Sequence, residues 1–154
     1  NLSLCGSPKP GIKTGNALCL RPSTADYTLE TAVVNQNESW KGVVMYGDDN
    51  NLLTLGCEAD RLKLKAVNDG KELILADMKL PASSLYLRMK VTDGIRCSFT
   101  YSEDGRKWKE IEYDLSPSAL KSLVRWDRIS RPGLYQQGAL DKPAVYGYCW
   151  LRNE

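Results

Sequence analysis

Three acidic residues, Glu110, Glu112 and Asp114, alternate along the stretch KEIEYD. Side chains two apart on a β-strand share a face. Two carboxyl groups about 5–5.5 Å apart are what a retaining glycoside hydrolase uses as nucleophile and acid. Lys107 and Lys109 extend the polar character of the stretch, so we favour a short solvated strand after a turn. We therefore expect no catalytic activity from this chain alone and assign no catalytic residue.

The sequence has no histidine. That absence excludes a Ser-His-Asp or Cys-His nucleophile site, histidine-ligated zinc and acid–base catalysis by imidazole. The five cysteines are odd in number and form no C-x-x-C pair, so neither a zinc ribbon nor a full disulfide framework is indicated. Cys97 is expected to be a buried structural thiol. One disulfide, from Cys5 or Cys19 to Cys149, is the pairing we consider, and the compartment stays open.

Oxygen-bearing side chains gather in the run Asp48-Asp49-Asn50-Asn51. Such oxygens are ligands for calcium, but Asp and Asn are also the residues that a tight turn needs. We favour the turn and expect no cofactor and no metal site, with a structural calcium ion as the alternative.

Aromatic side chains could bind sugars, because sugar C–H faces stack on rings while neighbouring polar groups bond the hydroxyls. Trp40, Tyr46 and Trp126 are the aromatics that we expect to be most available, whereas Trp108 and Trp150 look structural. Packing in the core or at a sheet edge is the alternative for each aromatic. The candidates for glycan binding or domain contact are Trp40, Tyr46, Asp48, Arg88, Trp126, Tyr135 and Gln136.

The stretch from Leu85 to Trp108 predicts the geometry that would position such groups. Apolar and polar residues alternate on both sides of a turn, which is typical of half-buried antiparallel strands. A second turn at 102–105 leads to Trp108, whose ring is expected to cover the end of the core.

The turn inside this stretch can be chosen by its register. A two-residue loop, Asp93-Gly94, would place Arg96 beside the core. A three-residue loop, 92–94, pairs Val91 with Ile95 and puts every apolar residue on one face. We predict the three-residue loop, with Gly94 at positive φ.

Runs with strand periodicity, separated by Gly, Pro, Asn and Asp clusters, recur along the chain. In RLKLKAV, the leucines should point inward and the basic residues outward. The stretch 116–125 is the one helix candidate, because Ser116 can cap it and Pro117 fits its first turn. The expected strands are 2–5, 16–21, 26–35, 42–46, 52–57, 61–67, 72–77, 85–91, 95–101, 111–113, 133–136 and 144–151.

Short strands with turns every 8–12 residues predict an all-β fold, a two-sheet antiparallel β-sandwich, with a closed barrel as the alternative. The length of 154 residues indicates a single domain, 1–154. A formal net charge of +2 without a basic run predicts no nucleic-acid partner. No stretch approaches the roughly 20 apolar residues of a membrane helix. The chain starts without Met or a signal-peptide pattern, so we expect a processed product or a piece of a longer protein.

Six segments of the chain, taken together and in their order, carry a resemblance to a known family: LSLCGSP, NALCLRPSTADYTLETAV, KGVVMYGDDNNLLTLG, LYLRMKV, CSFTYSEDGRKWKEI and RPGLYQQG. The series resembles the C-terminal β-sandwich module of family-43 glycoside hydrolases, the β-xylosidases and α-arabinofuranosidases. The resemblance covers nearly the whole chain and implies a concanavalin A-like (lectin/glucanase) jelly roll. The ordered set is much more specific than the Tyr-Ser-x-Asp-Gly-x-x-Trp element, which recurs in many carbohydrate-related sandwiches.

The resemblance implies a non-catalytic accessory module of a larger carbohydrate-active protein, bracing its catalytic domain, with glycan binding as a further role. In the β-xylosidases a loop before the segment that matches RPGLYQQG carries an aromatic reaching into the catalytic pocket. Trp126 is the residue at that place here, but the glycine- and phenylalanine-rich sequence of the family is absent around it. The family's five-bladed catalytic propeller is not in this chain.

The expected partners are the catalytic domain of the parent glycosidase and a plant-type oligo- or polysaccharide, with neither nucleic acid nor a membrane. A free-standing lectin-like carbohydrate-binding protein is the alternative. A hydrolase that uses Glu110, Glu112 or Asp114 is a third and weaker hypothesis.

Overall fold

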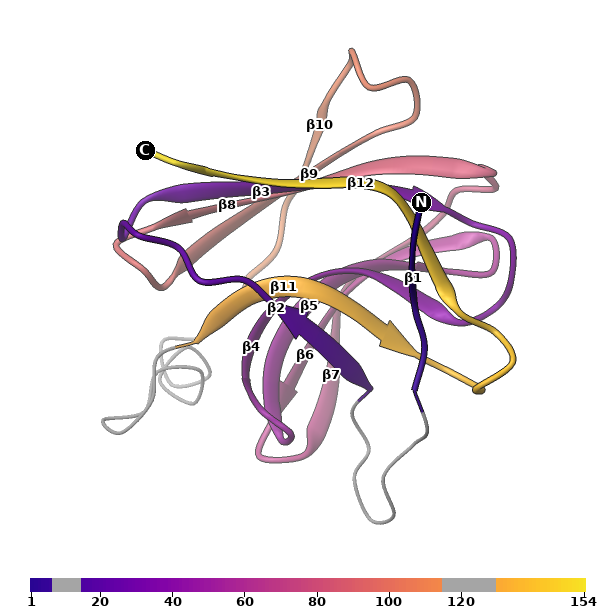
Figure 1. Cartoon of the computed structure of the whole chain (residues 1–154), viewed down its shortest axis with the longest axis horizontal. Helices are drawn as coiled ribbons and strands as arrows, with labels where there is room; N and C mark the ends of the chain where they lie inside the picture. Colours follow the sequence, from indigo (N-terminus) through magenta and orange to yellow (C-terminus); the bar gives the residue numbers. More distant parts are fainter. Residues whose placement is uncertain (7–14, 115–129) are drawn as a thin grey trace.

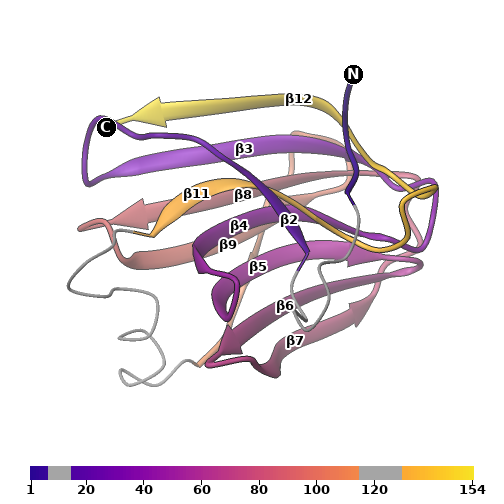
Figure 2. The same cartoon turned by 60° about the horizontal axis from the view of Figure 1, so that its bottom comes forward.

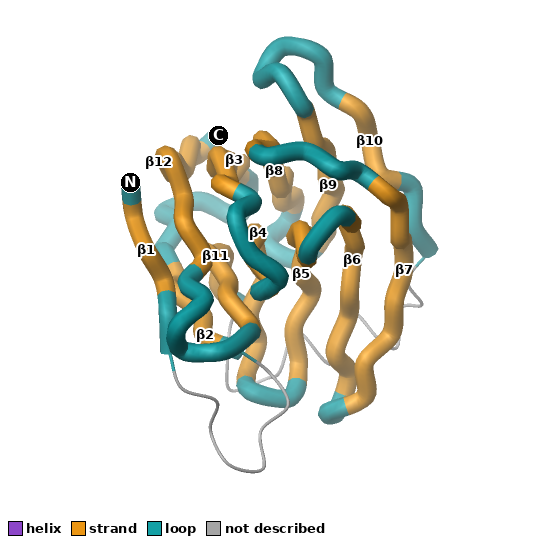
Figure 3. Tube along the Cα trace, turned by 90° about the vertical axis from the view of Figure 1, so that its right-hand side faces the viewer, coloured by secondary structure: helices purple, strands orange, loops and turns teal. Residues whose placement is uncertain are grey.

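A computed structural model describes residues 1–6, 15–114 and 130–154. They form two six-stranded antiparallel sheets that lie one above the other (Figures 1 and 2). Figure 3 shows the same arrangement from the side, turned by 90° from the view of Figure 1. The predicted all-β sandwich is confirmed, and the closed barrel is wrong for the described residues. These contain no helix, and the helix expected at 116–125 lies outside them.

The two sheets have the same number of strands but differ in strand order. Sheet A has the order β1 (Leu2–Leu4), β12 (Ala144–Asn153), β3 (Tyr27–Val34), β8 (Ser84–Thr92), β9 (Arg96–Ser102) and β10 (Lys109–Ile111). Sheet B has the order β2 (Asn16–Cys19), β11 (Arg131–Gln137), β4 (Trp40–Asp48), β5 (Asn51–Glu58), β6 (Arg61–Asn68) and β7 (Lys71–Lys79).

The core lies between the sheets and follows the alternation of the sequence. Leu87 and Met89 of β8 are fully buried in one cluster with Leu62 and Leu64 of β6. The basic residues of β6 point to the other side of sheet B, as the RLKLKAV pattern predicts. The core is therefore built by period two on both layers.

The hairpin of β8 and β9 has the predicted loop length but a different register. Thr92 pairs with Arg96, so the three loop residues are 93–95, and Ile95 lies exposed at the turn. Gly94 has the expected positive φ of 73°, and Asp93 also has a positive φ, of 55°. The pairing is shifted by two residues, which keeps every strand side chain on its predicted face.

A distant segment explains that shift. The amide of Asp93 donates to the carboxylate of Asp26 at 2.8 Å, and the amide of Gly94 donates to the Ala25 carbonyl at 2.7 Å. The turn is thus held by residues on the approach to β3, which a local pattern does not reveal.

The five cysteines are all free thiols in this structure. Cys19 of β2 and Cys149 of β12 are both among these free thiols, so the pairing of these two is wrong. Cys5 is free as well and lies on the surface.

Candidate functional site

The outer faces of the two sheets, which point away from the core, hold most of the candidate residues. Trp40, Tyr46 and Tyr135 come together on the outer face of sheet B. Arg88 lies on the outer face of sheet A. The predicted residues are therefore divided between opposite sides of the sandwich, and Trp126 lies outside the described residues.

A second hydrophobic cluster, separate from the core, covers the outer face of sheet B. Its buried members are Trp40, Val44, Leu52, Val67 and Tyr135, with Ala17 and Tyr46 packed against them. The expectation that Trp40 is available was wrong, because its side chain is fully buried. Its indole lies over Gly56, where an added Cβ would meet Nε1 at 2.4 Å. Nε1 donates to Thr54 Oγ1 at 3.1 Å, so its polar tip is already satisfied.

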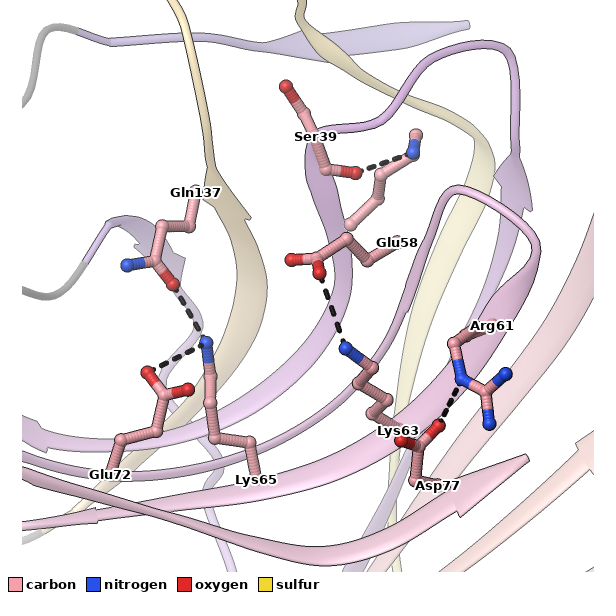
Figure 4. Close-up of polar contacts among 9 residues, drawn as sticks. Ser39, Glu58, Arg61, Lys63, Lys65, Glu72, Asp77 and Gln137 are labelled. Atoms are coloured by element: carbon pink, nitrogen blue, oxygen red, sulfur yellow. Dashed lines mark hydrogen bonds and ion pairs between the residues drawn. The ribbon is translucent and has the colours of Figure 1, made fainter. Parts of the chain in front are cut away.

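Lys65 closes this cluster from the β6 side. Its ammonium lies 4.3 Å from the centre of the Trp40 ring, donates to Gln137 Oε1 at 2.8 Å and lies 3.6 Å from Glu72. Figure 4 shows the contacts of Lys65 with Gln137 and Glu72 beside two further pairs on the same face, Lys63 with Glu58 and Arg61 with Asp77. Burial lowers the pKa of Lys65, and the Glu72 carboxylate opposes that shift. The polar groups of this face mainly bond one another.

The remaining sheet B candidates also have internal partners. Tyr135 Oη accepts a hydrogen bond from the Gly15 amide at 2.6 Å, and Tyr46 donates to Asp49. Gln136 is fully buried with Nε2 unpaired among the described residues, and its Oε1 accepts from Asn16. Tyr135 and Gln136 therefore lie inside the packing, where a glycan cannot reach them without rearrangement.

The Asp48-Asp49-Asn50-Asn51 run forms the turn that we favoured. Asp48 Oδ1 accepts from the Asn50 amide and from Asn51 Nδ2, each at 2.8 Å. Asn51 Oδ1 in turn accepts from the Asp69 amide at 3.0 Å, which ties this turn to the β6–β7 turn. These oxygens are used within the turns, so the cluster needs no ion to explain it, and the calcium hypothesis stays a prediction. No group of three or more His, Cys, Asp or Glu in the described part could hold a metal ion.

The outer face of sheet A has a different character. A row of paired residues crosses five strands: Trp150, Glu30, Arg88, Thr100 and Glu110. Arg88 Nε and Nη2 donate to Glu30 Oε2 at 2.9 and 2.6 Å. Glu30 is buried and also accepts from Tyr148 through Oε1 at 2.6 Å.

Aromatic rings surround this ion pair. The Trp108 ring centre lies 3.8 Å from the Arg88 guanidinium carbon, and the centres of the Tyr86 and Tyr148 rings are 6.3 Å apart. We call Glu30, Tyr86, Arg88, Trp108, Tyr148 and Trp150 the sheet A platform. The expectation that Trp108 covers the end of the core was wrong, because the ring packs on Arg88 outside the sandwich.

The turn that carries Trp108 is held by its own side chains. Asp104 Oδ1 accepts from the amides of Arg106 and Lys107, both at 2.8 Å, and Ser102 Oγ accepts from the Gly105 amide at 2.8 Å. The amide bonds from Lys107 and Arg106, with a further hydrogen bond from the Ser102 hydroxyl, lower the pKa of Asp104 to about 2. Gly105 has a φ of 74° and lies against the Tyr86 ring. The Tyr-Ser-x-Asp-Gly-x-x-Trp element thus encodes a fixed turn beside the platform.

The three alternating carboxylates lie in and just after β10, the last strand of sheet A. Glu110, Glu112 and Asp114 are exposed, while Ile111 between them is buried. Tyr113 points toward the core, with its ring centre 5.9 Å from that of Phe99. This is the solvated strand that we favoured, in which alternation sends the acids outward.

Sequence reasoning found Arg88 but missed its partners. Glu30 is the one charged residue in the mostly apolar run LETAVV, and such a residue is rarely buried without a partner. Tyr148 and Trp150 are two residues apart on β12, so the sequence spacing alone places both side chains on the same face of the strand.

Comparison with known proteins places these faces in context. Residues 2–131 match the family model described as the beta xylosidase C-terminal concanavalin A-like domain. No curated protein sequence matches the chain. No helix in the described part is long and apolar enough to cross a membrane.

Three solved structures illustrate the fold that the chain shares. The GH43 protein BlXynB of Bacillus licheniformis is 18% identical with a TM-score of 0.74, over 90% of this chain and 30% of that one. The xylan beta-1,4-xylosidase of Bacillus halodurans C-125 is 16% identical with a TM-score of 0.77, over 98% and 32%. The carbohydrate binding module CBM66 of Bacillus subtilis is 15% identical with a TM-score of 0.56, over 84% and 76%. The chain therefore spans about a third of the two GH43 proteins.

Proposed function

The chain belongs to the family of beta xylosidase C-terminal concanavalin A-like domains, and from that premise we propose a non-catalytic accessory module of a glycoside hydrolase. In this role it would brace the catalytic domain of the enzyme to which it is joined. The GH43 proteins with this fold are about three times as long as the aligned region, which leaves room there for a further domain.

The open edge of sheet B is the observation that carries the bracing role. β7 is the last strand of that sheet, and among the described residues no strand pairs with its other side. Leu73 and Ile74, adjacent on this edge, are 54% and 43% exposed. Long edge strands with exposed apolar side chains invite pairing and are normally protected. A partner domain that covers β7 would supply that protection.

The first test is the sequence of the full-length gene product, where we expect a catalytic domain of a glycoside hydrolase on the same chain. In that protein, the double substitution Leu73→Asp and Ile74→Asp should shorten the half-life of activity on heating several-fold. Leu140→Asp is the control and should leave the half-life unchanged, because Leu140 is 59% exposed between β11 and β12, and β11 is separated from β7 by three strands of sheet B. Equal half-lives for all variants would contradict the bracing role.

The lack of catalysis is tested separately with the isolated chain on xylan, arabinan and β-glucan. We expect no hydrolysis, because the acids of 110–114 are exposed to solvent and line only an open depression at the edge of sheet A, together with Arg96 and Ser98. Robust turnover that is lost in Glu112→Gln would overturn this part of the proposal.

A free-standing lectin-like protein is the second candidate, and the exposed Tyr148 and the partly exposed Trp150 on the outer face of sheet A favour it. The discriminating observation is again the gene product. A chain that ends near these bounds and still binds glycan would support the lectin, whereas a joined catalytic domain supports the accessory module.

A further inference from the structure

We infer that the sheet A platform is a binding surface for a neutral oligosaccharide, with sugar rings stacked on Tyr148 and Trp150 and hydroxyls bonded by Arg88. The inference rests on the proposed function, because it names the ligand and the face that an accessory module of a glycoside hydrolase would use. It assigns this role to a face whose aromatics the sequence analysis treated as structural or left unassigned.

The floor of the platform has the layout of a stacking surface. Tyr148 and Tyr86 occupy one row across the sheet, with the small Ala32 between them. Trp150 and Arg88 occupy the next row, with Glu30 between them. Two strand spacings make each row roughly 9–10 Å long, and residues two apart lie roughly 7 Å from each other. Such an area accommodates about two sugar rings, which stack on aromatic faces as they do in other sugar sites.

The polar centre of the platform is fixed before any ligand arrives. Glu30 accepts from Arg88 twice and from Tyr148 once, and the Arg88 guanidinium carbon lies 3.8 Å from the centre of the Trp108 ring. A group held in this way loses little side-chain freedom on binding. The platform therefore has the preorganisation that a weak sugar contact requires.

The charge of this centre selects neutral sugars. Glu30 compensates the charge of Arg88, so this guanidinium offers its N–H donors as part of a neutral pair. Nη1 has no hydrogen bond among the described residues, and the Arg88 side chain is 34% exposed. A spare planar donor on a compensated cation matches a hydroxyl better than a carboxylate.

A raised turn forms one side of the platform. The β9–β10 connection stands above sheet A on the side away from sheet B (Figure 1). It brings Gly105 against the Tyr86 ring and Trp108 against Arg88. The platform is thus a floor with a wall, which limits the directions in which a sugar chain can lie.

A purely structural role fits these contacts less well. Tyr148 is 38% exposed although its hydroxyl is bonded to a buried carboxylate. A buried ion pair contributes little net stability compared with apolar residues of the same volume. A cluster kept for stability alone is expected to be closed over, as the sheet B cluster is.

The four tryptophans make the test site-specific, because each indole N–H gives its own proton–nitrogen signal in NMR. The probes are xylohexaose, arabinohexaose and cellohexaose, added to the ¹⁵N-labelled chain up to 10 mM. With at least one probe we expect saturable shifts of the Trp108 and Trp150 signals and none of the buried Trp40 signal. Trp150→Ala should weaken that binding at least five-fold.

The control for Arg88→Ala is Arg61→Ala, since both arginines pair with an acid but lie on opposite outer faces. The first should weaken binding at least five-fold and the second should leave it unchanged. No shift of Trp108 or Trp150 with any probe, or shifts only with a glucuronic-acid-substituted xylo-oligosaccharide, would overturn the inference. Neither result touches the β7 test, so failure of the platform and failure of the accessory role remain distinguishable.

Discussion

The outer faces of the two sheets are both lined with aromatic and basic side chains, but the central ones are buried on sheet B and partly exposed on sheet A. On sheet B, Trp40 is buried under Lys65, and both polar tips are bonded within the protein. On sheet A, Tyr148 and Arg88 remain partly exposed around a bonded, buried Glu30. The arrangement on sheet B is closed within the protein, whereas the arrangement on sheet A leaves side chains accessible at the surface, where the inferred ligand would bind.

This difference teaches that an outward-facing aromatic is not in itself a binding residue. Both Trp40 and Trp150 sit on strand positions that face away from the core. Trp40 is covered because Gly56 on the neighbouring strand leaves room for its ring. A tryptophan on an outer face is buried when the neighbouring strands supply a glycine beneath its ring and a long side chain above it, as Gly56 and Lys65 do for Trp40.

Replacing Trp40 gives the largest expected effect and would sharpen the comparison. Trp40→Ala removes a fully buried indole and its bond to Thr54, so it should lower the free energy of unfolding by about 3–5 kcal/mol. Trp150→Ala on the other face should cost under about 1 kcal/mol. Urea unfolding of both variants measures the contrast, and similar losses would mean that the faces do not differ in role.

Replacing Arg88 should give the next largest effect. Arg88→Ala leaves the buried Glu30 with only its bond from Tyr148, which should cost about 2 kcal/mol, discounted because Arg88 is partly exposed. The double variant Glu30→Gln with Arg88→Met should regain most of that loss, since no uncompensated charge remains. Thermal and urea unfolding measure both, and a double variant as unstable as Arg88→Ala would contradict a charge-based cost.

The alternation of the sequence predicted the layers because period two is a local property. Leu62 and Leu64 of β6, and Leu87 and Met89 of β8, could each be placed from their neighbours alone. The β8–β9 register could not, because its turn is held by Ala25 and Asp26, far away in the sequence. The alternation of apolar and polar residues predicts which face each side chain occupies. Long-range hydrogen bonds decide which of two β8–β9 registers, two residues apart, is formed.

The candidate site was predicted less well than the fold. Arg88 was singled out, but Trp40 was expected to be available and is buried, and Trp108 was expected to cover the core and packs on Arg88 instead. Burial of such a ring depends on residues that only the sheet brings close, such as Gly56 and Lys65 for Trp40. Gly56 and Lys65 are distant from Trp40 in the sequence, so their contact with it could not be predicted. Glu30, by contrast, is a charged residue in a mostly apolar strand, which indicates that it has a polar partner.

A smaller effect is expected from the hydroxyl of Tyr148. Tyr148→Phe removes the bond to Glu30 and should lower the free energy of unfolding by about 1 kcal/mol. Tyr86→Phe is the matched control, because no hydrogen bond of the Tyr86 hydroxyl is found in the described residues. It should be neutral in the same unfolding assay. Equal effects of the two substitutions would show that Glu30 does not depend on Tyr148.

The smallest effect concerns the wall of the platform and its response to acid. The amides of Lys107 and Arg106 and the Ser102 hydroxyl hold the pKa of Asp104 at about 2, below its ordinary 3.8. Because the folded-state pKa is depressed, the support that Asp104 gives the turn is full above pH 3.8 and is lost as the pH falls through about 2. The Trp108 indole signal should therefore titrate with a midpoint near 2, measured by NMR between pH 5 and 1.5. Asp104→Asn keeps an acceptor oxygen but cannot ionise, so it should abolish that titration while the Trp40 signal stays unchanged in both proteins. A midpoint near 4 in the parent chain would mean that the turn is not held by these bonds, and the platform would lose its fixed wall.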